Sequence, residues 1–250
     1  MQTPPIGIRS LLLTVLAAGL IVMCAGCHSH VELPPASSKE YLDTVSDFSV
    51  GLAALQVGDD ITADRMLSSV TRLAPGEPAG WANWGVLAVR QRSFEAARQR
   101  VARALDLAPK DDRLYSLLGV LESKAGRTSE AVAAFRRAAA INPQDLRTAY
   151  SLAQEIERQG DAGSDAEVAR LLEGIVARQP DNLAALLEMS RIAAKRGDAR
   201  SLTSVLARVK SQTAGWPEPV RAQFEQLQAM VAAGDLHAAG ARTTWMSCMP

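Results

Sequence analysis

The fold is decided by one stretch of 34 residues, Asp112–Asp145, which reads DRLYSLLGVLESKAGRTSEAVAAFRRAAAINPQD. Apolar residues recur in it every three or four positions, in two runs that are separated at Gly126, and the second run ends at Pro143. This spacing is typical of two amphipathic helices joined by a short turn. Because one such pair cannot bury its own apolar face, the stretch predicts stacked neighbours of the same kind.

Neighbours of this kind lie on both sides of it, at a spacing of 34 residues. The predicted units are 44–77, 78–111, 112–145, 146–182 and 183–216, and the fourth is three residues longer because of an insertion at Gly160–Asp165. Residues 217–250 are predicted to form a closing helix or a degenerate sixth repeat, which covers the last apolar face. The positions that keep the spacing are Pro75, Pro109 and Pro143; Gly51, Gly85 and Gly119; Ala63, Ala97 and Ala131; and the breaks at Gly58, Arg92 and Gly126.

These residues resemble the tetratricopeptide repeat (TPR), a helix-turn-helix unit of about 34 residues. The resemblance implies an all-α fold, a right-handed α-solenoid of about five to six TPR helix-turn-helix repeats. In that family the first helix of each repeat lines the concave face, where partner peptides lie. In 112–145 the resemblance rests on Tyr115, Leu118, Gly119, Gly126, Ala131, Phe135, Ala138 and Pro143.

Packing expectations follow for two groups of residues. Gly85 and Gly119 are expected where the two helices of one repeat approach closely, so that a larger side chain would overpack the crossing. The aromatic side chains of the second and third units are expected in the core. These are Trp81, Trp84, Tyr115 and Phe135.

The first residues are interpreted as a signal peptide, 1–26, with an apolar core at Leu11–Met23 that is too short to span a bilayer comfortably. Ala25, Gly26 and Cys27 resemble the lipobox of bacterial lipoproteins, although Cys24 stands where that family usually has a branched apolar residue. The resemblance implies a lipid on Cys27 and a protein of the bacterial cell envelope, anchored to a membrane and facing the periplasm. His28 directly after this cysteine points to the outer membrane, and residues 27–43 are expected to form a flexible tether.

Two alternatives remain open at this stage. Cys24, Cys27 and His28 also form CxxCH, the attachment signature of c-type haem, which would make the chain a redox subunit. The array also looks like the leading TPR segment of larger bacterial envelope proteins, so the chain could be the front part of one of them.

The sequence offers little that could carry chemistry. The 27 basic and 27 acidic side chains balance, so no global field favours a nucleic-acid partner. The phosphate-binding, zinc-protease, serine-hydrolase and calcium-loop motifs are absent from the sequence. We therefore expect a protein that is not an enzyme and that uses no metal and no cofactor.

The candidate site is the concave groove, which is expected to hold a protein or peptide partner. Position 13 of four successive repeats is a cation (Arg90, Lys124, Arg158 and Lys195), and such a row could grip an acidic peptide or a C-terminal carboxylate. The simpler interpretation is that a cation in the last turn favours the helix dipole. The residues predicted to line the groove are Asn83, Val86, Arg90, Arg113, Val120, Lys124, Arg147, Tyr150, Gln154, Arg158, Arg191 and Lys195.

Overall fold

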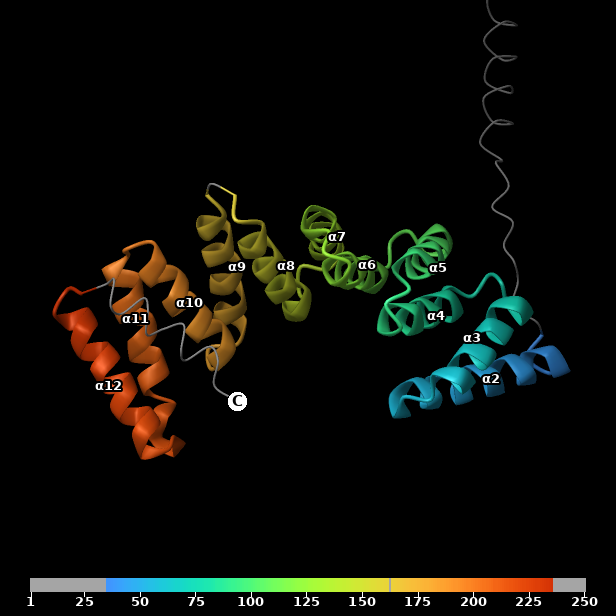
Figure 1. Cartoon of the computed structure of the whole chain (residues 1–250), viewed down its shortest axis with the longest axis horizontal. Helices are drawn as coiled ribbons and strands as arrows, with labels where there is room; N and C mark the ends of the chain where they lie inside the picture. Colours follow the sequence, from blue (N-terminus) through green and yellow to red (C-terminus); the bar gives the residue numbers. More distant parts are fainter. Residues whose placement is uncertain (1–34, 162, 236–250) are drawn as a thin grey trace, which may run out of the picture.

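The computed structural model describes residues 35–161 and 163–235 (Figure 1). This part of the chain holds eleven α-helices, one short 3-10 helix and no strand, which confirms the predicted all-α architecture. The helices are α2 (Lys39–Val57), α3 (Asp60–Leu73), α4 (Pro78–Arg90), α5 (Phe94–Leu107), α6 (Asp112–Lys124), α7 (Thr128–Ile141), α8 (Leu146–Gln159), α9 (Ser164–Arg178), α10 (Leu183–Lys195), α11 (Ala199–Lys210), η1 (Thr213–Gly215) and α12 (Glu218–Ala232).

The helices form consecutive antiparallel pairs, and the pairs follow one another in sequence order along the long axis of the molecule (Figure 1). Each pair corresponds to one predicted repeat, and α12 packs on α11 after the fifth pair. The first helices α2, α4 and α6 contact one another across repeats more than the second helices do. They therefore line the inner side of the array over the first three repeats.

The first helix begins earlier than the sequence predicts. Residues 39–43, expected to belong to the tether, are the first turn of α2, because Ser38 caps this helix by accepting a hydrogen bond from the backbone N–H of Tyr41 at 3.1 Å. The predicted signal peptide, Cys27 and the last 15 residues lie outside the described residues. In the part that the structure describes, no helix has the length and apolar character needed to cross a membrane.

The turns between the two helices of a repeat fall where the sequence places them. Gly58 and Gly126 adopt φ values of 83° and 76°, in the left-handed region that glycine tolerates best. Arg92 stands at the same position of the second repeat and also has a positive φ, 57°. It is the one residue other than glycine with a positive φ in the described ranges. A side chain in this region costs backbone energy, of the order of 1 kcal/mol.

The close approach predicted at two glycines is confirmed. A Cβ atom on Gly119 would lie 2.7 Å from a ring carbon of Phe135, and one on Gly85 would lie 2.9 Å from a methyl of Val101. Both contacts join the two helices of a single repeat. The missing side chains let each first helix pack directly against the large residue on its partner.

The aromatic residues divide into two groups. Phe135 is buried as predicted, with 3% of its surface exposed. Trp84 is partly buried and packs against the core cluster of the first two repeats, so the expectation holds for it in part. The expectation is wrong for Trp81 and Tyr115, which are only partly buried and belong to none of the core clusters. The polar edges of all three reach acceptors near the surface, as the indole N–H of Trp84 does with Asp64 at 2.7 Å.

The buried apolar residues form three separate clusters. The first, around Leu67 and Leu87, joins the first two repeats, and the second, around Val101 and Leu121, joins the second and third repeats. The third is much larger and runs from Ala131 to Val231, through all later repeats to α12. The array therefore has a continuous C-terminal core and two smaller N-terminal ones.

Candidate functional site

The predicted row of cations at position 13 does not stand free along the groove. Arg90 donates to the backbone carbonyl of Leu55 at 2.6 Å and forms an ion pair with Asp60, which begins α3 of the preceding repeat. Lys195 makes the equivalent contact, with 2.6 Å between its Nζ and Oδ1 of Asp165 in the first turn of α9. Both pairs span 30 residues of sequence. These two cations therefore join neighbouring repeats.

Arg158 is engaged in a different way. Its guanidinium donates to the hydroxyl of Ser123 at 3.0 Å and lies 3.1 Å from a carboxylate oxygen of Glu155, whose side chain is 5% exposed. Ser123 in turn donates to the other oxygen of Glu155 at 2.6 Å. This contact links α8 to α6.

Lys124 differs from the other three cations. Phe94 stands 30 residues before it, where Arg90 and Lys195 have an aspartate. Within the described residues Lys124 has neither an ion pair nor a hydrogen bond, and its side chain is exposed. Of the four predicted position-13 cations, it is the one whose charge remains available to a ligand.

Lys124 lies at a hollow between the first helices of the second and third repeats. The hollow has a volume of about 540 Å³. Such a volume is within the range of ligand pockets. Its apolar lining includes Val86 and Val120, which are 39% and 38% exposed and are two of the seven large apolar side chains that are exposed in the described part of the chain. The complete lining is Val86, Val89, Arg90, Arg92, Phe94, Leu117, Val120 and Lys124.

The C-terminal half of the predicted groove has a different character. Arg191 forms ion pairs with both Glu157 and Glu188, and all three side chains are about four-fifths buried. Burial alone would lower the pKa of Arg191, but the hydrogen bonds to the two carboxylates outweigh it and raise this pKa. Burial also raises the pKa of Tyr150, which packs partly buried against the same region. The paired charged groups of this half contact one another, and Gln154 is the exposed residue beside them.

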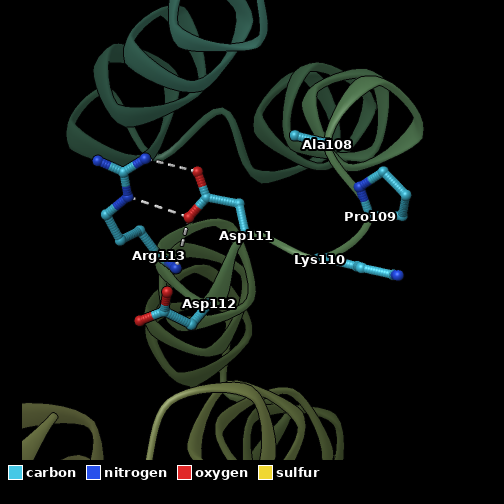
Figure 2. A pocket seen from close by; sticks show the side chains of 6 residues that line it. All are labelled: Ala108, Pro109, Lys110, Asp111, Asp112 and Arg113. Atoms are coloured by element: carbon cyan, nitrogen blue, oxygen red, sulfur yellow. Dashed lines mark hydrogen bonds and ion pairs between the residues drawn. The ribbon is translucent and has the colours of Figure 1, made fainter. Parts of the chain in front are cut away.

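Three further predicted groove residues contact their own helices. Arg113 folds onto Asp111, the N-cap of α6, with 2.7 Å between Nη2 and Oδ2 (Figure 2). This hydrogen bond is the main reason that the pKa of Asp111 lies below its ordinary value. Arg147 lies 3.8 Å from Asp145 in the equivalent arrangement, with 94% of its side chain exposed. Asn83 donates to the carbonyl of Ala79, one turn earlier in α4.

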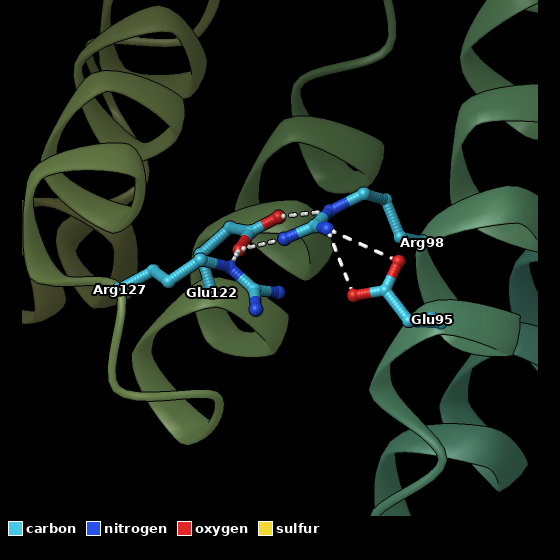
Figure 3. A network of polar contacts seen from close by, with 4 residues as sticks. All are labelled: Glu95, Arg98, Glu122 and Arg127. Carbon is cyan, nitrogen blue, oxygen red and sulfur yellow. Dashed lines mark hydrogen bonds and ion pairs between the residues drawn. The ribbon is translucent and has the colours of Figure 1, made fainter.

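A buried carboxylate holds the second and third repeats together near the hollow. Glu122 is 4% exposed and accepts two hydrogen bonds from Arg98 of α5, at 2.9 and 3.0 Å, and another from Arg127 (Figure 3). Burial alone would raise the pKa of Glu122, but the two guanidinium groups outweigh it and hold this pKa below its ordinary value. The carboxylate remains ionised at neutral pH and fixes α5 against α6.

Sequence reasoning missed two functional features of this region. The first is the interval of 30 residues that pairs position 13 with the preceding repeat. It was detectable, because an aspartate stands at that distance before Arg90 and Lys195. The second is the contribution of Arg92 and Phe94 to the hollow, since only residues of the first helices were considered. The described residues hold no group of three or more histidine, cysteine, aspartate or glutamate side chains placed to bind a metal ion.

Comparison with known proteins supports the fold of stacked helix pairs. A family model described as tetratricopeptide repeat matches residues 83–145. A comparison with curated protein sequences finds no match. The described part of the chain is an all-α solenoid of stacked helix pairs, and residues 83–145 within it match the tetratricopeptide repeat.

Three of the solved structures with a similar fold are those of pilF, PilW and YrrB. The pilF protein of Pseudomonas aeruginosa is 16% identical, with a TM-score of 0.63 over 82% of this chain and 90% of that one. PilW, described as a widely conserved type IV pilus biogenesis factor, is 15% identical, with a TM-score of 0.57 over 82% and 90%. YrrB, described as a TPR protein with an unusual peptide-binding site, is 15% identical, with a TM-score of 0.55 over 68% and 86%. At these identities the likeness concerns the fold.

Proposed function

We propose that the protein is a membrane-anchored scaffold of the bacterial cell envelope, which holds partner proteins on the inner side of its solenoid and has no catalytic activity of its own. The observation that carries the proposal is the hollow between α4 and α6. It presents exposed Val86 and Val120 beside Lys124, a cation that has no ion pair among the described residues. Exposed apolar side chains that gather in a concave site are typical of surfaces that bind other proteins.

The comparisons support the same class of function. YrrB is described as having a peptide-binding site, and PilW as a factor in type IV pilus biogenesis. A role in the assembly of an envelope structure such as a pilus is therefore the narrower form of the proposal. It rests on similarity of fold, which is shared by proteins with many roles.

Photo-crosslinking in cells tests the scaffold function. A photoreactive amino acid replaces Val86 on the inner side and, as the matched control, Ala133, an exposed residue of α7. We expect a defined protein adduct from position 86, identified by mass spectrometry, and none from position 133. Equal adducts from both positions, or none from position 86, would contradict a partner site on the inner side.

The membrane anchor is tested separately, by the intact mass of the protein extracted from membranes after export in a bacterial host. The proposal is supported by the lipobox-like residues Ala25, Gly26 and Cys27. We expect loss of residues 1–26 and added acyl mass on Cys27. A retained Cys24 that carries the mass of a haem would instead make the chain an electron-transfer protein.

A further inference from the structure

The hollow between α4 and α6 has a fixed apolar floor. Val89 is 7% exposed and belongs to the small core cluster of the second and third repeats, and Phe94 and Leu117 pack against that cluster. The more exposed Val86 and Val120 lie beside them. The two valines occupy position 9 of successive repeats, and Leu52 occupies the same position in the first repeat. A chain-like ligand that crosses the first helices would meet one apolar side chain per repeat.

Two cations border this apolar surface without a charge to balance them. The side chains of Arg92 and Lys124 both line the hollow, and neither has a hydrogen bond or an ion pair among the described residues. Arg90, which lies beside them, is already engaged by Asp60 and by the carbonyl of Leu55. The site therefore combines an apolar floor with two exposed positive charges that have no ion-pair partner in the described ranges. It is complementary to a carboxylate that follows or precedes a bulky apolar side chain.

The backbone at Arg92 is an independent observation on the same residue. Its φ of 57° is the conformation that glycine adopts in the corresponding turns at Gly58 and Gly126. Folding would be easier with glycine at this position. The arginine has no structural partner that would offset the cost within the described residues. A ligand held by its guanidinium accounts for an arginine here.

The polar contacts of the next repeat limit the site on one side. Position 9 changes from valine to Gln154 in the fourth repeat and to Arg191 in the fifth, and Arg191 is paired with two carboxylates. Between α6 and α8, Ser123 and Glu155 are hydrogen-bonded at 2.6 Å. The apolar row therefore ends at α6, which carries Lys124 in its last turn.

We propose that the hollow between α4 and α6 binds an extended segment of a partner protein, in which a bulky apolar side chain lies next to a carboxylate held by Arg92 and Lys124. The proposal rests on the scaffold function proposed above and adds to it the chemistry of the ligand. It assigns a binding role to Arg92, a residue of the turn rather than of a first helix.

Binding of defined peptides to the full chain tests this chemistry. The probes are four fluorescein-labelled octapeptides with the frame Gly-Ser-X-Gly-X-Z-Ser-Gly, where X is leucine or serine and Z is glutamate or glutamine. We expect the leucine-glutamate peptide to bind, and to bind at least about tenfold more tightly than either singly changed peptide, as a charged hydrogen bond or a buried leucine requires. Failure of this peptide to bind at about 1 mM, or equal binding of the glutamine form, overturns the proposal.

Three variants locate the site. We expect Lys124→Met and Arg92→Gly each to weaken the leucine-glutamate peptide by about tenfold and to leave the leucine-glutamine peptide unchanged. The matched control is Lys210→Met, which removes a lysine from the last turn of α11, and it should bind as the wild type does. Glycine keeps the positive φ of this turn without its steric cost, so the Arg92→Gly protein should be at least as stable as the wild type, and its urea unfolding is measured alongside binding to separate lost binding from unfolding. Unchanged binding in both variants overturns the proposal.

The outcome is separable from that of the scaffold test. Adducts from position 86 would support the scaffold function. If peptide binding is at the same time unaffected by the substitutions of Arg92 and Lys124, the carboxylate site is rejected. Dimerisation of the wild-type chain that is lost in both variants would assign the hollow to a second copy of the chain, and would also overturn the proposal.

Discussion

Lys195 and Asp165 form an ion pair across the boundary between the fifth and fourth repeats, with 2.6 Å between Nζ and Oδ1. Arg90 and Asp60 repeat this contact between the second and first repeats, over the same interval of 30 residues. A cation at the end of a first helix therefore joins two repeats where the preceding second helix begins with an acid. Where it begins with Phe94, the cation Lys124 is left for a ligand.

The ion pair of Lys195 with Asp165 should make a small contribution to stability. Its side chains are 49% and 25% exposed. We therefore expect a coupling energy of about 0.5 kcal/mol. The measurement is a double-mutant cycle with Lys195→Met and Asp165→Asn in urea unfolding. The same cycle with Lys210→Met in place of Lys195→Met serves as the control and should give no coupling. Equal coupling in the two cycles would contradict the contact.

Gly119→Ala should destabilise the protein by about 1 to 3 kcal/mol, because the new Cβ would lie 2.7 Å from the ring of Phe135. Gly174→Ala is the matched control, since Gly174 lies within α9 and has no neighbouring atom within 4 Å of the added carbon. There alanine should stabilise the helix by about 0.5 to 1 kcal/mol. Thermal unfolding measures both. A Gly119→Ala protein as stable as the wild type would refute the close packing of α6 on α7.

Glu122→Gln should lower the free energy of unfolding at neutral pH by about 2 kcal/mol, because it removes the counter-charge of Arg127 and leaves Arg98 with only Glu95 as an ion-pair partner among the described residues. The pKa of Glu122 is held below its ordinary value of 4.5 in the folded protein. Its stabilisation is therefore fully present above pH 4.5 and is lost as the pH falls through the lower folded value. The difference in stability between wild type and variant should shrink over that acidic range. A difference that does not depend on pH would be inconsistent with an ionised Glu122.

Arg92→Gly should raise the free energy of unfolding by about 1 kcal/mol, because glycine adopts the positive φ of this turn without steric cost. The neighbouring Gln91→Gly is the control. Gln91 has a φ of −75°, so glycine there gains nothing and adds conformational entropy to the unfolded chain. Chemical denaturation of the two variants should therefore give changes of opposite sign. A destabilised Arg92→Gly protein would mean that the arginine has a structural role.

The periodic residues were sufficient to predict the architecture. The spacing of Pro75, Pro109 and Pro143 and of the turn residues determines where each helix pair starts and ends, because helix ends depend on local residues. The role of Gly119 could also be predicted, since it lies in the interior of a helix that must pack closely on its partner. The exception is the start of α2, where Ser38 supplies a cap that extends the helix into the expected tether.

The site could be predicted only in outline. The structure places Lys124 and Val120 on the exposed surface of a first helix. Whether the cations Arg90, Lys124 and Lys195 are paired, however, depends on the residue 30 positions earlier, in another repeat. A sequence pattern analysed within a single repeat cannot identify a partner that lies in the preceding repeat. The exposure of Trp84 has a similar origin, because Asp64 of the first repeat draws the indole N–H toward the surface.

The division of the buried residues into three clusters also has a consequence for how the array opens. Repeats that share a cluster lose their protection against hydrogen exchange together, whereas repeats in different clusters can open independently. The helices α4 and α6 share the small middle cluster, and the hollow is built on it. A ligand bound there contacts both helices and should stabilise the part of the solenoid that has the smaller core clusters. It should slow amide exchange in α4, α5 and α6, whose residues form the middle cluster, and change it little in α9 to α12.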